Sequence, residues 1–175
     1  MSPAVQAGGQ GVISANPAEP LLDVPGGTMG CDIHLYVEYK KDGHWLTADV
    51  WEKSRYSDEQ GRMEVPSQFE YYGDRAYFLF SKLADCGRCT DNKPIIQNRG
   101  FPDDACAEVK AYRDDYGADG HSDSWLTYAE LEKENWKNTE TIPEEWRVCL
   151  GRLWNLSFEK DVKHEEIRVV FWFDN

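Results

Sequence analysis

Basic residues are scarce in this 175-residue chain, which has 19 Lys+Arg and 32 Asp+Glu for a net charge of −13. Binding to a nucleic-acid backbone needs clustered lysines and arginines, so the composition argues against direct nucleic-acid binding. No run of eighteen apolar residues occurs, which excludes a membrane-spanning helix. The five cysteines are odd in number and no apolar signal segment precedes them, so we expect reduced thiols in a cytoplasmic protein.

The first 28 residues lack aromatic side chains, lysine and arginine, while they hold four prolines and five glycines. A segment of this composition buries too little apolar surface to offset the entropy lost when it orders. We therefore predict a disordered leader over residues 1–28. Residues 29–175 contain every aromatic side chain, and we expect them to form a single domain.

The domain combines strand and helix patterns. Residues 31–39 alternate apolar and polar side chains, and a turn at Asp42-Gly43 leads to a returning strand over 44–51. Helix spacing follows at 75–84, 103–116, 127–136 and 141–154, while residues 167–175 are apolar on both faces, as in a central strand. We expect an α+β fold: a small, mostly antiparallel sheet, made of the N-terminal hairpin and the C-terminal strand, with three to four helices and two long loops.

Asp32 and His34 lie two residues apart on the polar face of the first predicted strand. At about 3.3 Å per residue their Cα atoms are roughly 6.6 Å apart, so both side chains can reach one ion. A carboxylate with an imidazole suits a divalent metal such as zinc or manganese. Tyr36 shares this face and is a candidate ligand-binding residue. The alternative is that His34 bonds to Asp32 or Glu38 on a solvated surface.

A second candidate lies in residues 119–125, expected to form a turn between two helices. His121 has hydroxyl and carboxyl neighbours there, so it would complete the metal site or act as general acid or base. Ser122 beside it is a candidate ligand-binding residue. The alternative for this segment is an Asp-Gly turn followed by hydroxyl capping of the next helix.

Residues 99–104, Arg-Gly-Phe-Pro-Asp-Asp, precede a predicted helix whose free N–H groups favour an anion. Asp103 is a suitable N-cap for that helix and would satisfy those groups itself. Arg99 and Arg75 are then the cations expected to hold a phosphate or carboxylate. Asp104 is a candidate catalytic carboxylate.

Five segments in the same order resemble a family of small bacteriophage proteins that open with Met-Gly-Cys-Asp-Ile-His. They are MGCDIHLYVE at 29–38, RAYFLF at 75–80, RGFPDD at 99–104, DGHSDSWLT at 119–127 and VFWFDN at 170–175. The resemblance implies a phage origin, a usual start at Met29, action in the host cytoplasm and a polar site shared by these segments.

The leading hypothesis is a metal-dependent hydrolase of a phosphorylated small molecule such as a nucleotide. Asp32, His34 and His121 would hold the ion, and Arg75 or Arg99 would hold the phosphate. One alternative is a non-catalytic counter-defence protein that inhibits a basic host protein through its acidic surface. Another is a pocket that sequesters a nucleotide signal without cleaving it.

Overall fold

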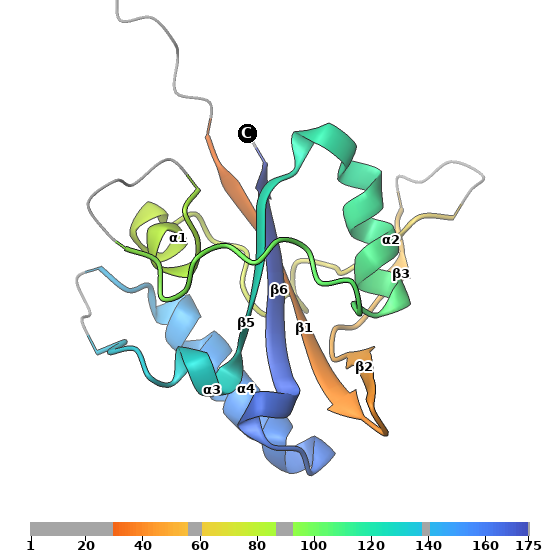
Figure 1. Cartoon of the computed structure of the whole chain (residues 1–175). Helices are drawn as coiled ribbons and strands as arrows, with labels where there is room; N and C mark the ends of the chain where they lie inside the picture. The colour runs from red at the N-terminus through yellow and green to blue at the C-terminus, as the bar shows by residue number, and fades with distance from the viewer. Residues whose placement is uncertain (1–29, 56–60, 87–92, 138–140, 175) are drawn as a thin grey trace, which may run out of the picture.

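The computed structural model describes residues 30–55, 61–86, 93–137 and 141–174, and the leader predicted over residues 1–28 lies outside them. The described chain forms a four-stranded antiparallel sheet in the order β2-β1-β6-β5, shown in Figure 1. Its strands are β1 (Asp32–Lys41), β2 (His44–Thr47), β5 (His121–Thr127) and β6 (Ile167–Asp174). A second sheet pairs β3 (Glu52–Lys53) with β4 (Met63–Glu64).

Helices cover both faces of the large sheet. The α-helices of the described residues are α1 (Tyr77–Leu83), α2 (Ala107–Tyr116), α3 (Tyr128–Leu131) and α4 (Glu144–Lys160). Helices α1, α3 and α4 pack on one face, here named the α4 face, and α2 packs on the other, the α2 face (Figure 1). The predicted α+β fold, with a mostly antiparallel sheet and four helices, is confirmed.

Strand β6 lies in the middle of the sheet, between β1 and β5, as its apolar sequence predicts. Phe171 and Phe173 point to the α4 face with Leu35 of β1, while Val170 and Trp172 point to the α2 face. Every residue from Ile167 to Phe173 is at most 1% exposed. Strand β6 therefore contributes side chains to the apolar layers on both faces of the sheet.

The polar row of β1 is exposed at Asp32 but buried at Tyr36 and Glu38, which corrects the solvated face that its alternation suggested. Tyr36 and Glu38 are 5% and 0% exposed, because α2 covers this side of the sheet. The Tyr36 ring stacks between Trp51, at 5.3 Å, and Trp172, at 5.2 Å. Tyr36 is thus a core residue and has no exposed surface for the ligand binding predicted for it.

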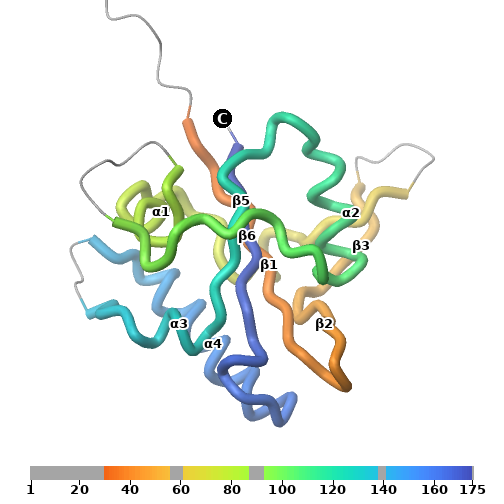
Figure 2. Tube along the Cα trace, in the orientation of Figure 1, coloured from red at the N-terminus to blue at the C-terminus, as the bar shows by residue number. Residues whose placement is uncertain are grey.

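Two predictions around residues 99–125 are wrong. His121 and Ser122 begin strand β5 instead of lying in a turn between helices, and α2 begins after Cys106, so Asp103 is not its N-cap. The segment before α2 crosses over β5 (Figure 2). Two hydrogen bonds fix this crossing: the Arg99 N–H donates to Ser124 Oγ, and the Gly100 N–H donates to the Asp123 carbonyl.

Candidate functional site

The two histidines of the predicted metal site lie on opposite faces of the sheet. His121 is paired with Phe173 and stacks on its ring at 6.2 Å, whereas His34 is paired with Trp172 and stacks on that ring at 5.7 Å. Successive residues of a strand project to opposite faces, so β6 separates the two imidazoles. The described residues include no group of three or more His, Cys, Asp or Glu side chains that could hold a metal ion.

His34 instead joins β1 to α2 and to the end of β6. Its Nδ1 atom lies 3.2 Å from the Tyr116 hydroxyl, and its Nε2 atom lies 3.2 Å from Asp174 Oδ2. Burial lowers the pKa of His34, and the neighbouring Asp174 carboxylate opposes that shift only in part. The lowered pKa favours a neutral ring, so His34 serves as a structural contact between these elements.

The arginines expected to hold a phosphate are both paired with carboxylates. Arg75 makes a bidentate pair with Asp32, with Nη2 at 2.6 Å from Oδ1, on the exposed surface. Arg99 makes a bidentate pair with Glu130, whose pKa is lowered because the Arg99 charge and hydrogen bonds outweigh its burial. Neither guanidinium has its full charge available for a phosphate.

The predicted catalytic residues are also held apart. His121 Nδ1 lies 3.1 Å from Ser122 Oγ, and its Nε2 atom is buried without a hydrogen-bond partner among the described residues. Ser122 has a φ of 56° at the irregular start of β5. Asp104 lies instead on the α2 face, where it accepts hydrogen bonds from Arg168 and Trp45.

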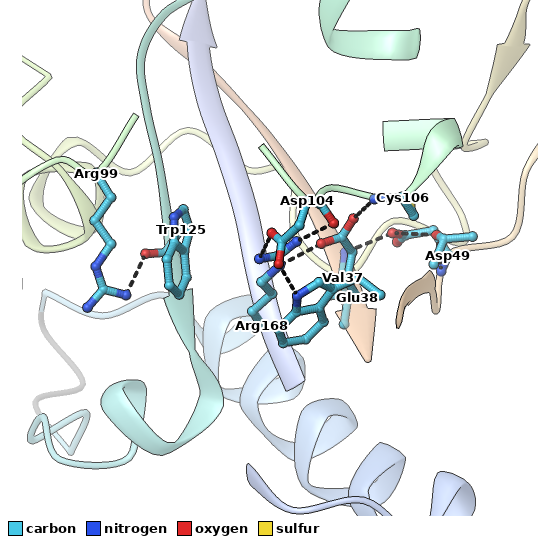
Figure 3. A network of polar contacts seen from close by, with 10 residues as sticks. Val37, Glu38, Asp49, Arg99, Asp104, Cys106, Trp125 and Arg168 are labelled. Carbon is cyan, nitrogen blue, oxygen red and sulfur yellow. Dashed lines mark hydrogen bonds and ion pairs between the residues drawn. The ribbon is translucent and has the colours of Figure 1, made fainter. Parts of the chain in front are cut away.

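Glu38 and Arg168 form a buried ion pair that the sequence reasoning missed (Figure 3). They face each other across β1 and β6, with Arg168 Nε at 2.6 Å from Glu38 Oε2. Arg168 Nη1 also donates to Asp104 at 2.8 Å, and the Cys106 N–H donates to Glu38 Oε1 at 2.7 Å. The sequence did contain a signal for this pair, because Arg168 is the one cation within the apolar residues 167–173. Both residues are at most 1% exposed, so this ion pair organises the fold and is closed to a ligand, whereas the Asp104 carboxylate, with 65% of its side chain exposed, faces solvent.

Cationic and aromatic side chains alternate across the same face. The Arg99 guanidinium lies 4.2 Å from the centre of the Trp125 ring, and Arg168 lies 5.5 Å from that ring and 3.9 Å from the Trp45 ring. Lys40 Nζ adds a further contact with Trp45 at 5.5 Å. Such contacts each contribute roughly 0.5–1 kcal/mol at exposed sites. This row links all four strands of the sheet.

A groove of about 460 Å³ opens on the other side of the molecule, between residues 67–74 and the first half of α4. We name it the acidic groove, since four carboxylates and a single guanidinium line it: Glu70, Asp74, Glu144, Glu145 and Arg152. Tyr71, Tyr72 and Val148 provide much of its remaining wall. Residues 52–74 correspond to one of the two long loops expected from the sequence, and no site was predicted there.

Arg152 is part of the wall of the acidic groove. Its guanidinium lies 3.8 Å from the centre of the Tyr71 ring and donates to the carbonyls of Phe69, at 3.0 Å, and Glu70, at 2.5 Å. These contacts fix the loop 67–74 against α4. They also direct the Arg152 N–H groups toward the backbone instead of toward the carboxylates.

One residue in the wall of the acidic groove carries a polar atom without a partner. Tyr72 lines it, is 3% exposed, and packs edge-on against Trp146 with ring centres 5.4 Å apart. The Tyr72 hydroxyl makes no hydrogen bond with any of the described residues. Burial, followed by the nearby carboxylates Asp74 and Glu145, raises the pKa of this hydroxyl. A buried hydroxyl without a partner costs free energy in the folded protein.

Added zinc or manganese is expected to leave the melting temperature of the protein unchanged. A metal that binds only the folded state raises stability with its concentration, and the separation of Asp32 and His34 from His121 denies it three shared ligands. Thermal unfolding with increasing metal measures this. A rise that His34→Ala or His121→Ala removes would restore the metal-site hypothesis.

No helix in the described ranges is long and apolar enough to cross a membrane. Comparison of the chain with models of known protein families, with curated proteins and with solved structures finds no match.

Proposed function

We propose that this chain is a non-catalytic binding protein that holds a basic segment of another protein in the acidic groove. The proposal rests on the imbalance of charge in this groove: four carboxylates line it with one guanidinium, and one of the four, Glu144, is also paired with Arg147, whose Nη1 lies 2.6 Å from its Oε2. The guanidinium of the groove, that of Arg152, already serves the loop backbone. A lysine or arginine from a partner would supply the missing positive charge through charge-assisted hydrogen bonds.

The surroundings of Glu70 favour a bound cation. Burial, and then repulsion from Asp74, raises the pKa of Glu70. The ionised carboxylate is therefore held at a free-energy cost in the unbound protein. A cationic side chain placed between these carboxylates removes part of that cost, so binding and ionisation support each other.

A tyrosine of the groove suits the rest of such a side chain. The alkyl stem of a lysine or arginine packs well on an aromatic ring while its charged end reaches the carboxylates. Tyr71, which is half-buried, offers such a ring at the groove, whereas Tyr72 is 3% exposed and closes the groove wall. A phosphate would instead meet four negative charges.

The resemblance to small bacteriophage proteins supports a host protein as the partner, bound in the host cytoplasm. A net charge of −13 would attract a basic surface and speed the encounter. The nucleotide hydrolase and the nucleotide-sequestering pocket gain no comparable support, because Arg75 and Arg99 are paired and the histidines lie on opposite sheet faces.

Calorimetric titration with a short oligolysine peptide tests the proposal. The double variant Asp74→Asn/Glu145→Gln removes two exposed carboxylates of the groove. We expect about tenfold weaker binding, which corresponds to about 1.4 kcal/mol and to roughly 0.7 kcal/mol for each exposed charge contact. The wild-type affinity should also fall as salt is added, since salt screens these contacts.

The matched control is Glu108→Gln/Asp114→Asn, which removes the same charge from α2, on the other side of the sheet. We expect this control to bind oligolysine nearly as well as the wild type does. Equal weakening of both variants would show that overall negative charge, and not the groove, attracts the peptide, and the proposal would be wrong.

A further inference from the structure

The outward side of α4 carries apolar side chains that the described chain leaves open to solvent. Val148, Trp154 and Phe158 are 55%, 49% and 66% exposed. Trp154 and Phe158 lie four residues apart and pack edge-to-face, with ring centres at 4.5 Å. Large aromatic side chains exposed together on one helix commonly mark a protein-binding surface.

Val148 and Phe158 belong to a regularly spaced row on the helix, and Trp154 lies beside this row. Glu144, Val148, Gly151, Asn155 and Phe158 follow one another at steps of four and three residues, and all five are exposed. This spacing places them along one side of α4, as in the contact seam of two packed helices. A side chain added at Gly151 would meet no atom within 4 Å, so a partner can approach the helix closely there.

The row is continuous with the acidic groove. Glu144 and Val148 belong to both, and the row then extends along α4 to Phe158. At 1.5 Å per residue, Glu144 and Phe158 are about 21 Å apart along the helix axis. A bound segment that fills the groove and follows the row therefore spans roughly four helical turns.

We propose that the partner of this chain docks through a basic amphipathic helix, which lays its apolar side along Val148, Trp154 and Phe158 and places its basic end in the acidic groove. This inference rests on the function proposed above and names the form of the basic segment. Cations are favoured at the C-terminal end of a helix. The bound helix therefore runs antiparallel to α4, with lysines or arginines in its last turn near Glu144 and Glu145.

Charge favours this occupant over a second copy of the chain. Two copies would each bring a net charge of −13 and would place further carboxylates beside the groove. The three apolar side chains expose on the order of 300 Å², which is below the roughly 800 Å² that each partner buries in a stable interface. A basic helix adds the groove contacts to this apolar area.

Two synthetic peptides of identical composition test the inference. One is helical, with a leucine row and lysines in its last turn, and the other is a scrambled sequence without an apolar row. The variant Trp154→Ser/Phe158→Ser should bind the amphipathic peptide at least tenfold more weakly, since buried aromatic anchors carry much of such binding energy. Its binding of oligolysine should stay unchanged, and the wild type should prefer the amphipathic peptide to the scrambled one.

The matched control is Leu46→Ser/Val50→Ser, which removes two other apolar side chains, 40% and 49% exposed, that lie outside α4. If Trp154→Ser/Phe158→Ser binds the amphipathic peptide normally while Asp74→Asn/Glu145→Gln does not, the inference fails and the proposed function stands. A wild-type dimer in sedimentation that the α4 variant abolishes would identify a second copy as the occupant. Variant-sensitive binding to phosphatidylcholine vesicles would identify a lipid surface, and either result overturns the inference.

Discussion

Replacing Arg168 with alanine is expected to lower the free energy of unfolding by about 3–5 kcal/mol, because it leaves a buried carboxylate without its counter-charge. Glu38 is 0% exposed, and Arg168 supplies its guanidinium partner at 2.6 Å. Asp104 and the Trp45 ring lose contacts at the same time. Domains of this kind have a total stability of about 5–15 kcal/mol, so the loss would be a large part of it. Urea unfolding followed by tryptophan fluorescence measures the change.

A matched control separates burial from pairing. Arg75→Ala also breaks a bidentate pair, with Asp32, but this pair lies on the exposed surface, where water replaces the lost contacts. We expect a much smaller change for it. The double variant Glu38→Leu/Arg168→Met should recover most of the stability, because no unpaired charge remains buried. Similar losses for Arg168→Ala and Arg75→Ala would contradict this account.

Asp49 is expected to make the protein less stable as the pH rises toward neutrality. Its side chain is 8% exposed, and burial raises its pKa to about 7. Oδ2 accepts the Val37 N–H at 2.8 Å, which extends the hydrogen bonding of β1 beyond the end of β2. Oδ1 is buried and has no hydrogen-bond partner among the described residues.

The sign of this effect is the reverse of that for a salt-bridged aspartate. The folded protein holds the Asp49 proton up to about pH 7, whereas the unfolded chain releases it near pH 3.8. Between these values the folded state binds more protons, so the free energy of unfolding falls as the pH rises. A shift of this size corresponds to about 4 kcal/mol, at about 1.4 kcal/mol per pH unit.

Asp49→Asn removes the titration and keeps an acceptor for the Val37 N–H. The stability of this variant relative to the wild type should increase by about 3 kcal/mol between pH 4 and pH 7. Urea unfolding across this range measures it, and the exposed Asp103→Asn variant shows the effect of removing one surface charge. A constant difference between Asp49→Asn and the wild type would show that Asp49 does not titrate in this range.

The fold was largely predictable because its signals are local. The alternation in residues 31–39 and the Asp42-Gly43 turn predict the β1–β2 hairpin, and the apolar residues 167–173 predict a central strand. The capping box of Thr127 and Glu130 correctly marks the start of α3. Strand β5 was missed because its polar residues His121, Ser122 and Asp123 are typical of a turn, and only pairing with β6 makes them a strand.

The arrangement of the site depends on contacts between distant segments, and the sequence pattern does not contain them. The register of His121 with Phe173 determines the sheet face that His121 occupies. Its separation from His34 therefore depends on the pairing of both strands with β6, and neither segment alone contains that information. Arg99 was predicted to hold a phosphate and Asp104 to be a catalytic carboxylate, and both side chains form ion pairs in the structure. Their partners, Glu130 and Arg168, lie 31 and 64 residues away. The acidic groove likewise joins the loop 67–74 to α4, which follows it much later in the chain.

The central place of β6 sets the order in which the molecule can assemble. During synthesis β1, β2 and β5 leave the ribosome first, and without β6 only the hairpin of β1 and β2 has its backbone partners. A chain cut before Ile167 would present the open backbone edges of β1 and β5, a known route to aggregation. Proteolytic loss of these last eight strand residues would therefore dismantle the sheet, whereas trimming an outer strand would only narrow it.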